Sequence, residues 1–166
     1  MSISIEDLFS QKTAIEGFSI DPKESFERLK ISRGYYANFS FATSIVNDKQ
    51  YNIPFIESKE FDGKIKYFGP HEQIFESLIA TKNRDLVQLA YKLKDYHLLR
   101  KKSDYDLDLD ITLNDIKNAE TYFNECGDRM RFFVKDPTAT YTKARKAIEV
   151  DMTSSRVKVS GLKIYD

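Results

Sequence analysis

The chain has 166 residues, with 26 lysines and arginines and 26 aspartates and glutamates, so its formal net charge is zero. This length is typical of one domain with a substantial core, and 41% hydrophobic and 31% charged residues are ordinary for a globular protein. A neutral chain has no overall electrostatic preference for nucleic acid, so any binding of RNA or DNA requires a local basic patch.

Three features of the sequence limit the class of protein further. No run approaches 18 apolar residues, so we expect no membrane span. Residues 1–7 lack a basic segment followed by an apolar one, so we expect no signal peptide and a cytoplasmic location. The single cysteine, Cys126, forms no intrachain disulfide and no zinc site by itself, and we expect neither a metal nor a cofactor.

The N-terminal part of the chain predicts two helices. Residues 3–15 show a weak amphipathic pattern, which suits a short first helix. Asp21 then has the character of an N-cap, and it is followed by proline at the first helical position, Pro22. We expect the second helix to run from there to about Asn47.

Residues 48–69 interrupt the helical pattern. Pro54 is incompatible with a helix interior, and two short segments flank Asp62-Gly63, a pair favoured in two-residue type I′ turns. The pattern predicts a β-hairpin at about residues 54–68, inserted between helices. An irregular loop is the alternative, because a lone hairpin needs support from other elements to persist.

Two further helices are expected after the insertion. Gly69-Pro70 begins the first, with His71 in its first turn. Asn83 caps the second, which should run from about Arg84 to Lys102.

The second of these helices carries a polar stripe. His97, Arg100 and Asp104 lie three and four residues apart, so they share one face of the helix. The stripe is either a site or a solvated face with an intrahelical Arg100–Asp104 ion pair, the commoner fate of charges at this spacing.

Residues 104–111 alternate between polar and apolar side chains, which predicts an extended connector with one face buried. Their Asp-x-Asp-x-Asp spacing also suggests a calcium loop. However, Leu109 stands where the sharp turn of such a loop needs glycine, and Asp115 is a poorer bidentate ligand than glutamate. We therefore assign no metal to this segment.

The last helix of the bundle has the clearest start signal in the chain, Thr112 with Asp115 three residues later. Apolar residues then repeat at spacings of three and four until the helix ends near Lys135. Cys126 belongs to this apolar stripe, so we interpret its thiol as part of the core.

The fold class that follows is all-α: an antiparallel up-down bundle of four to five helices, with an inserted β-hairpin and a short C-terminal extension. The bundle covers residues 1–135, with the insertion at about 48–69. The extension, residues 136–166, is more basic. It predicts a short helix at about residues 141–150 and a small hairpin around Ser160-Gly161.

Four segments, in chain order, resemble a known family. Residues 32–39 (Ser-Arg-Gly-Tyr-Tyr-Ala-Asn-Phe) resemble the S-R-x-Y-Y-A-x-F helix of HEPN-domain proteins. Residues 100–105 (Arg-Lys-Lys-Ser-Asp-Tyr) resemble the R-x-x-A-D-Y signature of the same branch. His71 and Ile111-Thr112 are similar to further features of that branch. The resemblance spans about residues 21–133 and excludes the hairpin and the extension.

The resemblance implies a helical bundle, usually dimeric, with polar residues beside the dimer cleft. Many HEPN proteins are metal-independent ribonucleases of bacterial toxin–antitoxin and phage-defence systems, often paired with a minimal nucleotidyltransferase. In the family an arginine stabilises charge on the phosphate, and a histidine four to six residues later moves a proton. The resemblance therefore implies a homodimer or heterodimer, with a nucleotidyltransferase and RNA as further partners.

This chain lacks the Arg-x4–6-His spacing, because its only histidines are His71 and His97. Arg100 matches the family arginine and His97 precedes it by one turn, so these two are the candidate catalytic residues. Two function classes stay open. We favour a HEPN-like subunit that acts mainly as a binding or assembly module; the alternative is a metal-independent ribonuclease toxin that cleaves RNA at the dimer cleft.

The same motifs predict a polar cluster drawn from three separated stretches. Arg33 and Tyr36 lie three apart on one helix, and Arg100 and Asp104 four apart on another, so each pair can face a common groove. Such a groove would suit a phosphate or an acidic group of a partner. In the alternative, Arg33 pairs with Asp104 and the residues only hold helices together. The predicted binding cluster comprises Arg33, Tyr36, His71, Asp104 and Tyr105.

Overall fold

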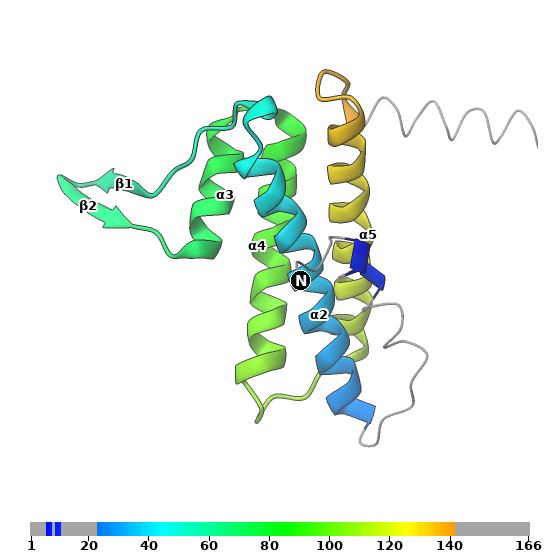
Figure 1. Ribbon diagram of the computed structural model, residues 1–166. Coiled ribbons are helices and arrows are strands. Elements are labelled where there is room, and N and C mark those ends of the chain that lie inside the picture. The colour runs from blue at the N-terminus through cyan, green and yellow to red at the C-terminus, as the bar shows by residue number, and fades with distance from the viewer. Residues whose placement is uncertain (1–5, 8, 11–22, 142–166) are drawn as a thin grey trace, which may run out of the picture.

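The computed structural model describes residues 6–7, 9–10 and 23–141. These residues form a mainly helical structure with one small antiparallel sheet, which confirms an all-α bundle with an inserted hairpin (Figure 1). In chain order the elements are α2 (Lys23–Asn47), the short 3-10 helix η1 (Lys49–Tyr51), β1 (Ser58–Phe61), β2 (Lys64–Tyr67), α3 (Pro70–Ala80), α4 (Arg84–Tyr105) and α5 (Leu113–Lys135).

Some expected elements fall outside the described residues. The first helix, predicted over residues 3–15, is described only at residues 6–7 and 9–10, which are helical. The predicted helix start at Asp21-Pro22 lies outside the described residues, as do the helix and hairpin expected beyond residue 141.

Helix α4 is the element against which α2, α3 and α5 all pack. These three helices point in one direction and α4 in the other (Figure 1). Their C-terminal ends therefore meet the N-terminal end of α4, around a shallow pocket lined by Tyr51, Ala80, Leu86 and Phe133. The up-down order expected from the sequence thus holds from α3 to α5 but not from α2 to α3. Residues 48–69 carry the chain back along the bundle before α3 begins.

The core lies where α4 meets the other helices. Leu89 and Leu93 are fully buried, and each such side chain stabilises the fold by about 1.5–3 kcal/mol. Cys126 is also fully buried, as the apolar stripe of the last helix predicts, and burial raises the pKa of its thiol to about 12. Among the described residues, no helix has the length and apolarity needed to cross a membrane.

Capping side chains fix the starts of α4 and α5 where the sequence predicts them. The Asn83 side chain accepts hydrogen bonds from the backbone N–H groups of Asp85 and Leu86. Thr112 and Asp115 form a reciprocal capping box, in which each side chain bonds the backbone of the other. Both predicted helix starts are confirmed.

The segment after α4 differs from the prediction. The helix continues to Tyr105, beyond the predicted end at Lys102. Leu107 and Leu109 are exposed, so among the apolar residues of the connector only Ile111 packs against the core. The physical reason is Arg28 on α2. Its guanidinium donates hydrogen bonds to carbonyl oxygens of the last turn of α4, including that of Lys102 (3.1 Å), and to that of Leu109. The connector is thus held by hydrogen bonds from Arg28 to backbone carbonyl groups and not by burial of its leucine side chains.

The insertion forms the predicted hairpin. Asp62 and Gly63 both have positive φ values, 49° and 72°, as a type I′ turn requires. Phe61 pairs with Lys64 directly across this turn. The hairpin projects away from the bundle (Figure 1), and every strand residue is exposed except Ser58, which is half-buried. We call it the hairpin arm.

Candidate functional site

Arg100 on α4 is enclosed by side chains of its own chain. It is only 7% exposed, and its guanidinium carbon lies 4.8 Å from the ring centroid of Tyr36 and 4.9 Å from that of Tyr105. Its Nη2 donates hydrogen bonds to both tyrosine hydroxyls. Its Nε lies 2.8 Å from Oδ2 of Asp104. We call these four residues the arginine cage.

Two helices build the cage. On α4, Asp104 follows Arg100 by one turn, so the two side chains meet on the same face. On α2, Ser32 lies one turn before Tyr36 and donates a hydrogen bond to Asp104 Oδ2 (3.2 Å). Burial opposes the charge of Arg100, but the hydrogen bond to Tyr105 and the charge of Asp104 outweigh it and raise the arginine pKa. The guanidinium therefore stays cationic, and its charge is already paired.

Two histidines lie against each other beside the cage. His71, from the first turn of α3, and His97, from α4, have ring centroids 4.5 Å apart. The Tyr35 hydroxyl lies 2.7 Å from His71 Nδ1, and the ring of Tyr36 is 6.4 Å from that of His71. Nδ1 of His97 is buried and has no hydrogen-bond partner among the described residues. We call His71 and His97 the histidine pair.

Both imidazoles are neutral at pH 7. Burial, followed by the charges of His71, Arg100 and Lys101, lowers the pKa of His97 to about 4. Burial, followed by Arg100, also lowers the pKa of His71. With its pKa this far below 7, His97 is unprotonated at pH 7, whereas general acid–base catalysis works best when the pKa lies near the working pH. The pair is better suited to accepting hydrogen bonds than to moving protons.

An open groove of about 510 Å³ adjoins the histidine pair, between α3 and α4. Both histidines line it, whereas Arg100 does not. Its wall also carries one negative and one positive side chain, Glu72 and Lys94, and the exposed Leu98. Both of these charges have ion-pair partners in the chain, Glu72 with Lys66 and Lys94 with Glu76, so the groove offers a ligand mainly neutral rings and apolar surface.

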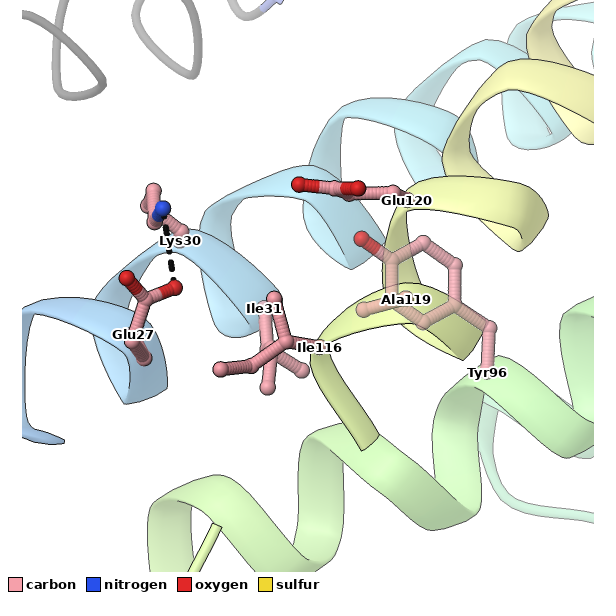
Figure 2. Close-up of a pocket in the computed structure, with 7 residues that line it drawn as sticks. All are labelled: Glu27, Lys30, Ile31, Tyr96, Ile116, Ala119 and Glu120. Atoms are coloured by element: carbon pink, nitrogen blue, oxygen red, sulfur yellow. Dashed lines mark ion pairs between the residues drawn. The ribbon is translucent and has the colours of Figure 1, made fainter. Parts of the chain in front are cut away.

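A much smaller cavity lies between α2, α4 and α5 (Figure 2). Its volume is about 20 Å³, which is room for about one water molecule. Tyr96 lines it from α4 and Ala119 from α5, while an ion pair between Lys30 and Glu27 (2.8 Å) lies at its α2 side. A space of this size holds no substrate, so it is a packing gap.

Arg33 lies outside both the cage and the pair. Its side chain is exposed and forms no hydrogen bond or ion pair with a described residue. A spacing of three residues leaves Arg33 about 60° around the helix from Tyr36, which turns its side chain to solvent. Asp104 is paired with Arg100 and Ser32 instead, so the alternative Arg33–Asp104 pair does not form.

The other predicted site residues all fall within the two groups. The cage holds Tyr36, Arg100, Asp104 and Tyr105, and the pair holds His71 and His97. Sequence reasoning missed two residues that reach these groups, Ser32 on Asp104 and Tyr35 on His71. The helical period signals Ser32, because it lies one turn before Tyr36. Within the described part of the chain, no group of three or more His, Cys, Asp or Glu side chains could hold a metal ion.

Part of this sequence is similar to the uncharacterized protein MJ0628 of Methanocaldococcus jannaschii. The two are 31% identical over 105 residues, which is 62% of this chain and 63% of that protein. The chain therefore matches less than two thirds of the length of this relative. No protein-family model matches the chain, and no solved structure matches it significantly. The name of this relative states no activity, so a function can be inferred only from the geometry of the cage, the pair and the groove.

Proposed function

We propose that the chain is a HEPN-like helical subunit of a toxin–antitoxin or phage-defence system and that it acts mainly as a binding and assembly module. The arginine cage is the observation that carries this proposal. The guanidinium of Arg100 is buried between two aromatic rings, bonded to two hydroxyls and paired with Asp104. A cation whose charge is satisfied by its own chain is not free to bind a scissile phosphate.

We propose that a second subunit binds at the groove beside the histidine pair. On α4, Tyr91, Leu98 and Tyr105 are spaced seven residues apart and all are exposed, so they form one apolar stripe along the helix. Glu72 and Lys94 add opposite charges to the groove wall. Both charges are already paired within the chain, Glu72 with Lys66 and Lys94 with Glu76, so the exposed apolar stripe is the surface left for a partner to cover. Two copies related by a two-fold axis can pack this stripe against itself, so a second copy of this chain is the occupant that we favour.

Oligomeric state tests this assignment. Leu98→Asp places a charge on the 63% exposed rim of the groove without touching the core. Val134→Asp, at a 42% exposed position on α5, is the matched control. By light scattering at high micromolar concentration we expect dimers for the wild type and Val134→Asp, and monomers for Leu98→Asp. A monomeric wild type, with no product of a neighbouring gene co-purifying from cells, contradicts the proposal.

The histidine pair favours one alternative, a metal-independent ribonuclease. Both histidines line an open groove, and Nδ1 of His97 has no hydrogen-bond partner among the described residues. Under this alternative, RNA cleavage survives EDTA and is lost in His97→Gln and Arg100→Lys. An RNA-cleavage assay on the purified chain and on its complex separates the two functions. Harmless expression without cleavage supports the binding module.

A further inference from the structure

The hairpin arm gathers its lysines on one side. In an antiparallel pair, directly opposite residues share a face and successive pairs alternate between faces. Lys59 pairs with Lys66 and, two residues along, Phe61 pairs with Lys64, so these four side chains form one face. We call it the lysine face. The strand pairs on the other face contain a single charged residue, Glu60.

The charges of the lysine face lower the stability of the isolated hairpin. Lys59 and Lys66 stand directly opposite each other, and like charges at opposed positions destabilise a strand pair. Lys66 has a partner in Glu72 of α3 (3.1 Å), but Lys59 and Lys64 have no ion-pair partner among the described residues. Residues 57–66 also contain Glu57, Glu60 and Asp62, so the positive charge is a property of this one face and not of the whole arm. A ligand that neutralises Lys59 and Lys64 on this face would relieve the repulsion in a hairpin that is only marginally stable by itself.

Phe61 determines what kind of anion fits. Its ring is 66% exposed and, by the strand register, adjoins Lys64 directly and Lys66 diagonally. Neighbours of these two kinds have Cβ atoms roughly 4.5–8 Å apart, so the ring and the ammonium groups can contact one short segment of a ligand. An aromatic face among cations matches an unpaired base beside its phosphates.

We propose that the lysine face binds single-stranded nucleic acid, with the lysines on the phosphates and Phe61 stacked on an unpaired base. An acidic peptide would pair with the lysines but offer no base to the ring. A duplex keeps its bases stacked on one another and away from Phe61. This activity goes beyond the proposed assembly function, because the face lies on the arm and needs no second subunit. Lys66 is the member of the face that contacts the groove wall, through its ion pair with Glu72, and Lys59, Phe61 and Lys64 do not line the groove.

Fluorescence anisotropy with a labelled single-stranded RNA of about 15 nucleotides, and DNA of the same sequence, tests the proposal across a salt series. We expect both probes to bind the wild type at low salt. Lys59→Gln/Lys64→Gln should weaken binding at least about tenfold and lower the slope of log K against log salt by about 1.4, since each phosphate contact contributes about 0.7. Phe61→Ala should weaken binding roughly 5- to 150-fold without changing the slope, because stacking carries no charge.

A matched control removes the same charge elsewhere. Lys49→Gln/Lys117→Gln changes two exposed lysines, on η1 and α5, and should keep the wild-type affinity and slope. Thermal melting followed by circular dichroism checks that each variant is folded. The proposal is overturned if the control variant loses as much affinity as Lys59→Gln/Lys64→Gln, or if the salt slope of Lys59→Gln/Lys64→Gln equals that of the wild type. It is also overturned if duplex RNA or polyglutamate binds as tightly as the single strands. Light scattering measures assembly separately, so failure of the nucleic-acid proposal would not contradict the proposed interface at the groove.

Discussion

The backbone of Gly34 on α2 passes so close to Tyr96 on α4 that a Cβ atom at position 34 would overlap the tyrosine hydroxyl. The same Cβ would lie 3.3 Å from a ring carbon of Phe123 on α5. Glycine in the middle of a helix costs about 1 kcal/mol relative to alanine. The missing Cβ is therefore required by the packing of three helices and not by the conformation of α2.

Gly34→Ala should lower the free energy of unfolding by about 1–3 kcal/mol, because overpacking outweighs the gain in helix propensity. Tyr96→Phe removes the overlapping oxygen and keeps the ring, so it should change stability little. The double variant should recover most of the loss. Urea denaturation of the three variants measures the cycle, and a stabilised Gly34→Ala single variant would contradict the close packing.

The two arginines of the family-like motifs should differ in their contribution to stability. Arg100→Ala leaves Asp104 without its cation and removes the hydrogen bond to the half-buried Tyr36 hydroxyl, so we expect a loss of about 3 kcal/mol in the free energy of unfolding. Arg33→Ala changes an exposed side chain without a described partner and should stay within about 0.5 kcal/mol of the wild type. Chemical denaturation checks both. Equal losses would show that Arg33 also has a buried partner.

Acid should destabilise the fold through the histidine pair. The pKa of His97 is about 4 in the folded chain, against 6.5 for an ordinary histidine, so the unfolded state binds more protons between these values. Stability is therefore complete above about pH 6.5 and is lost as the pH falls toward 4, and the lowered pKa of His71 acts in the same direction. Urea denaturation from pH 7.5 to 4 should show a smaller loss for His97→Gln than for the wild type. If His97→Gln and the wild type lose the same free energy of unfolding, the acid effect comes from the carboxylates and not from His97.

The hairpin arm should respond to its turn without affecting the bundle. Gly63 has a φ of 72°, so Gly63→Ala strains the turn by about 1 kcal/mol or more. Gly69→Ala is the control, because Gly69 has negative φ and open space around its Cα. Hydrogen exchange of the strand amides should quicken only in Gly63→Ala, while the melting temperature of the helices stays the same in both. A shared fall in melting temperature would mean that the arm supports the core.

Local chemistry allowed much of the fold to be predicted from the sequence. Asn83 and the Thr112–Asp115 pair mark helix starts because each side chain bonds backbone groups only two or three residues away. Asp62-Gly63 marks the turn for the same reason, since positive φ at both positions is a property of that dipeptide. Cys126 could be assigned to the core because its spacing from other apolar residues follows the helical period.

The arrangement of the site depended on contacts between distant segments, which no local pattern encodes. The helical period put Arg33 and Tyr36 near each other, but the packing of α2 against α4 directed only Tyr36 to Arg100. His71 meets His97 because residues 48–69 return the chain along the bundle, so that α3 runs parallel to α2 and lies beside α4. The sequence by itself thus determined the elements and their caps, through interactions within a turn or two. Tertiary packing alone decided which side chains meet, because burial and pairing depend on the neighbours that each face acquires.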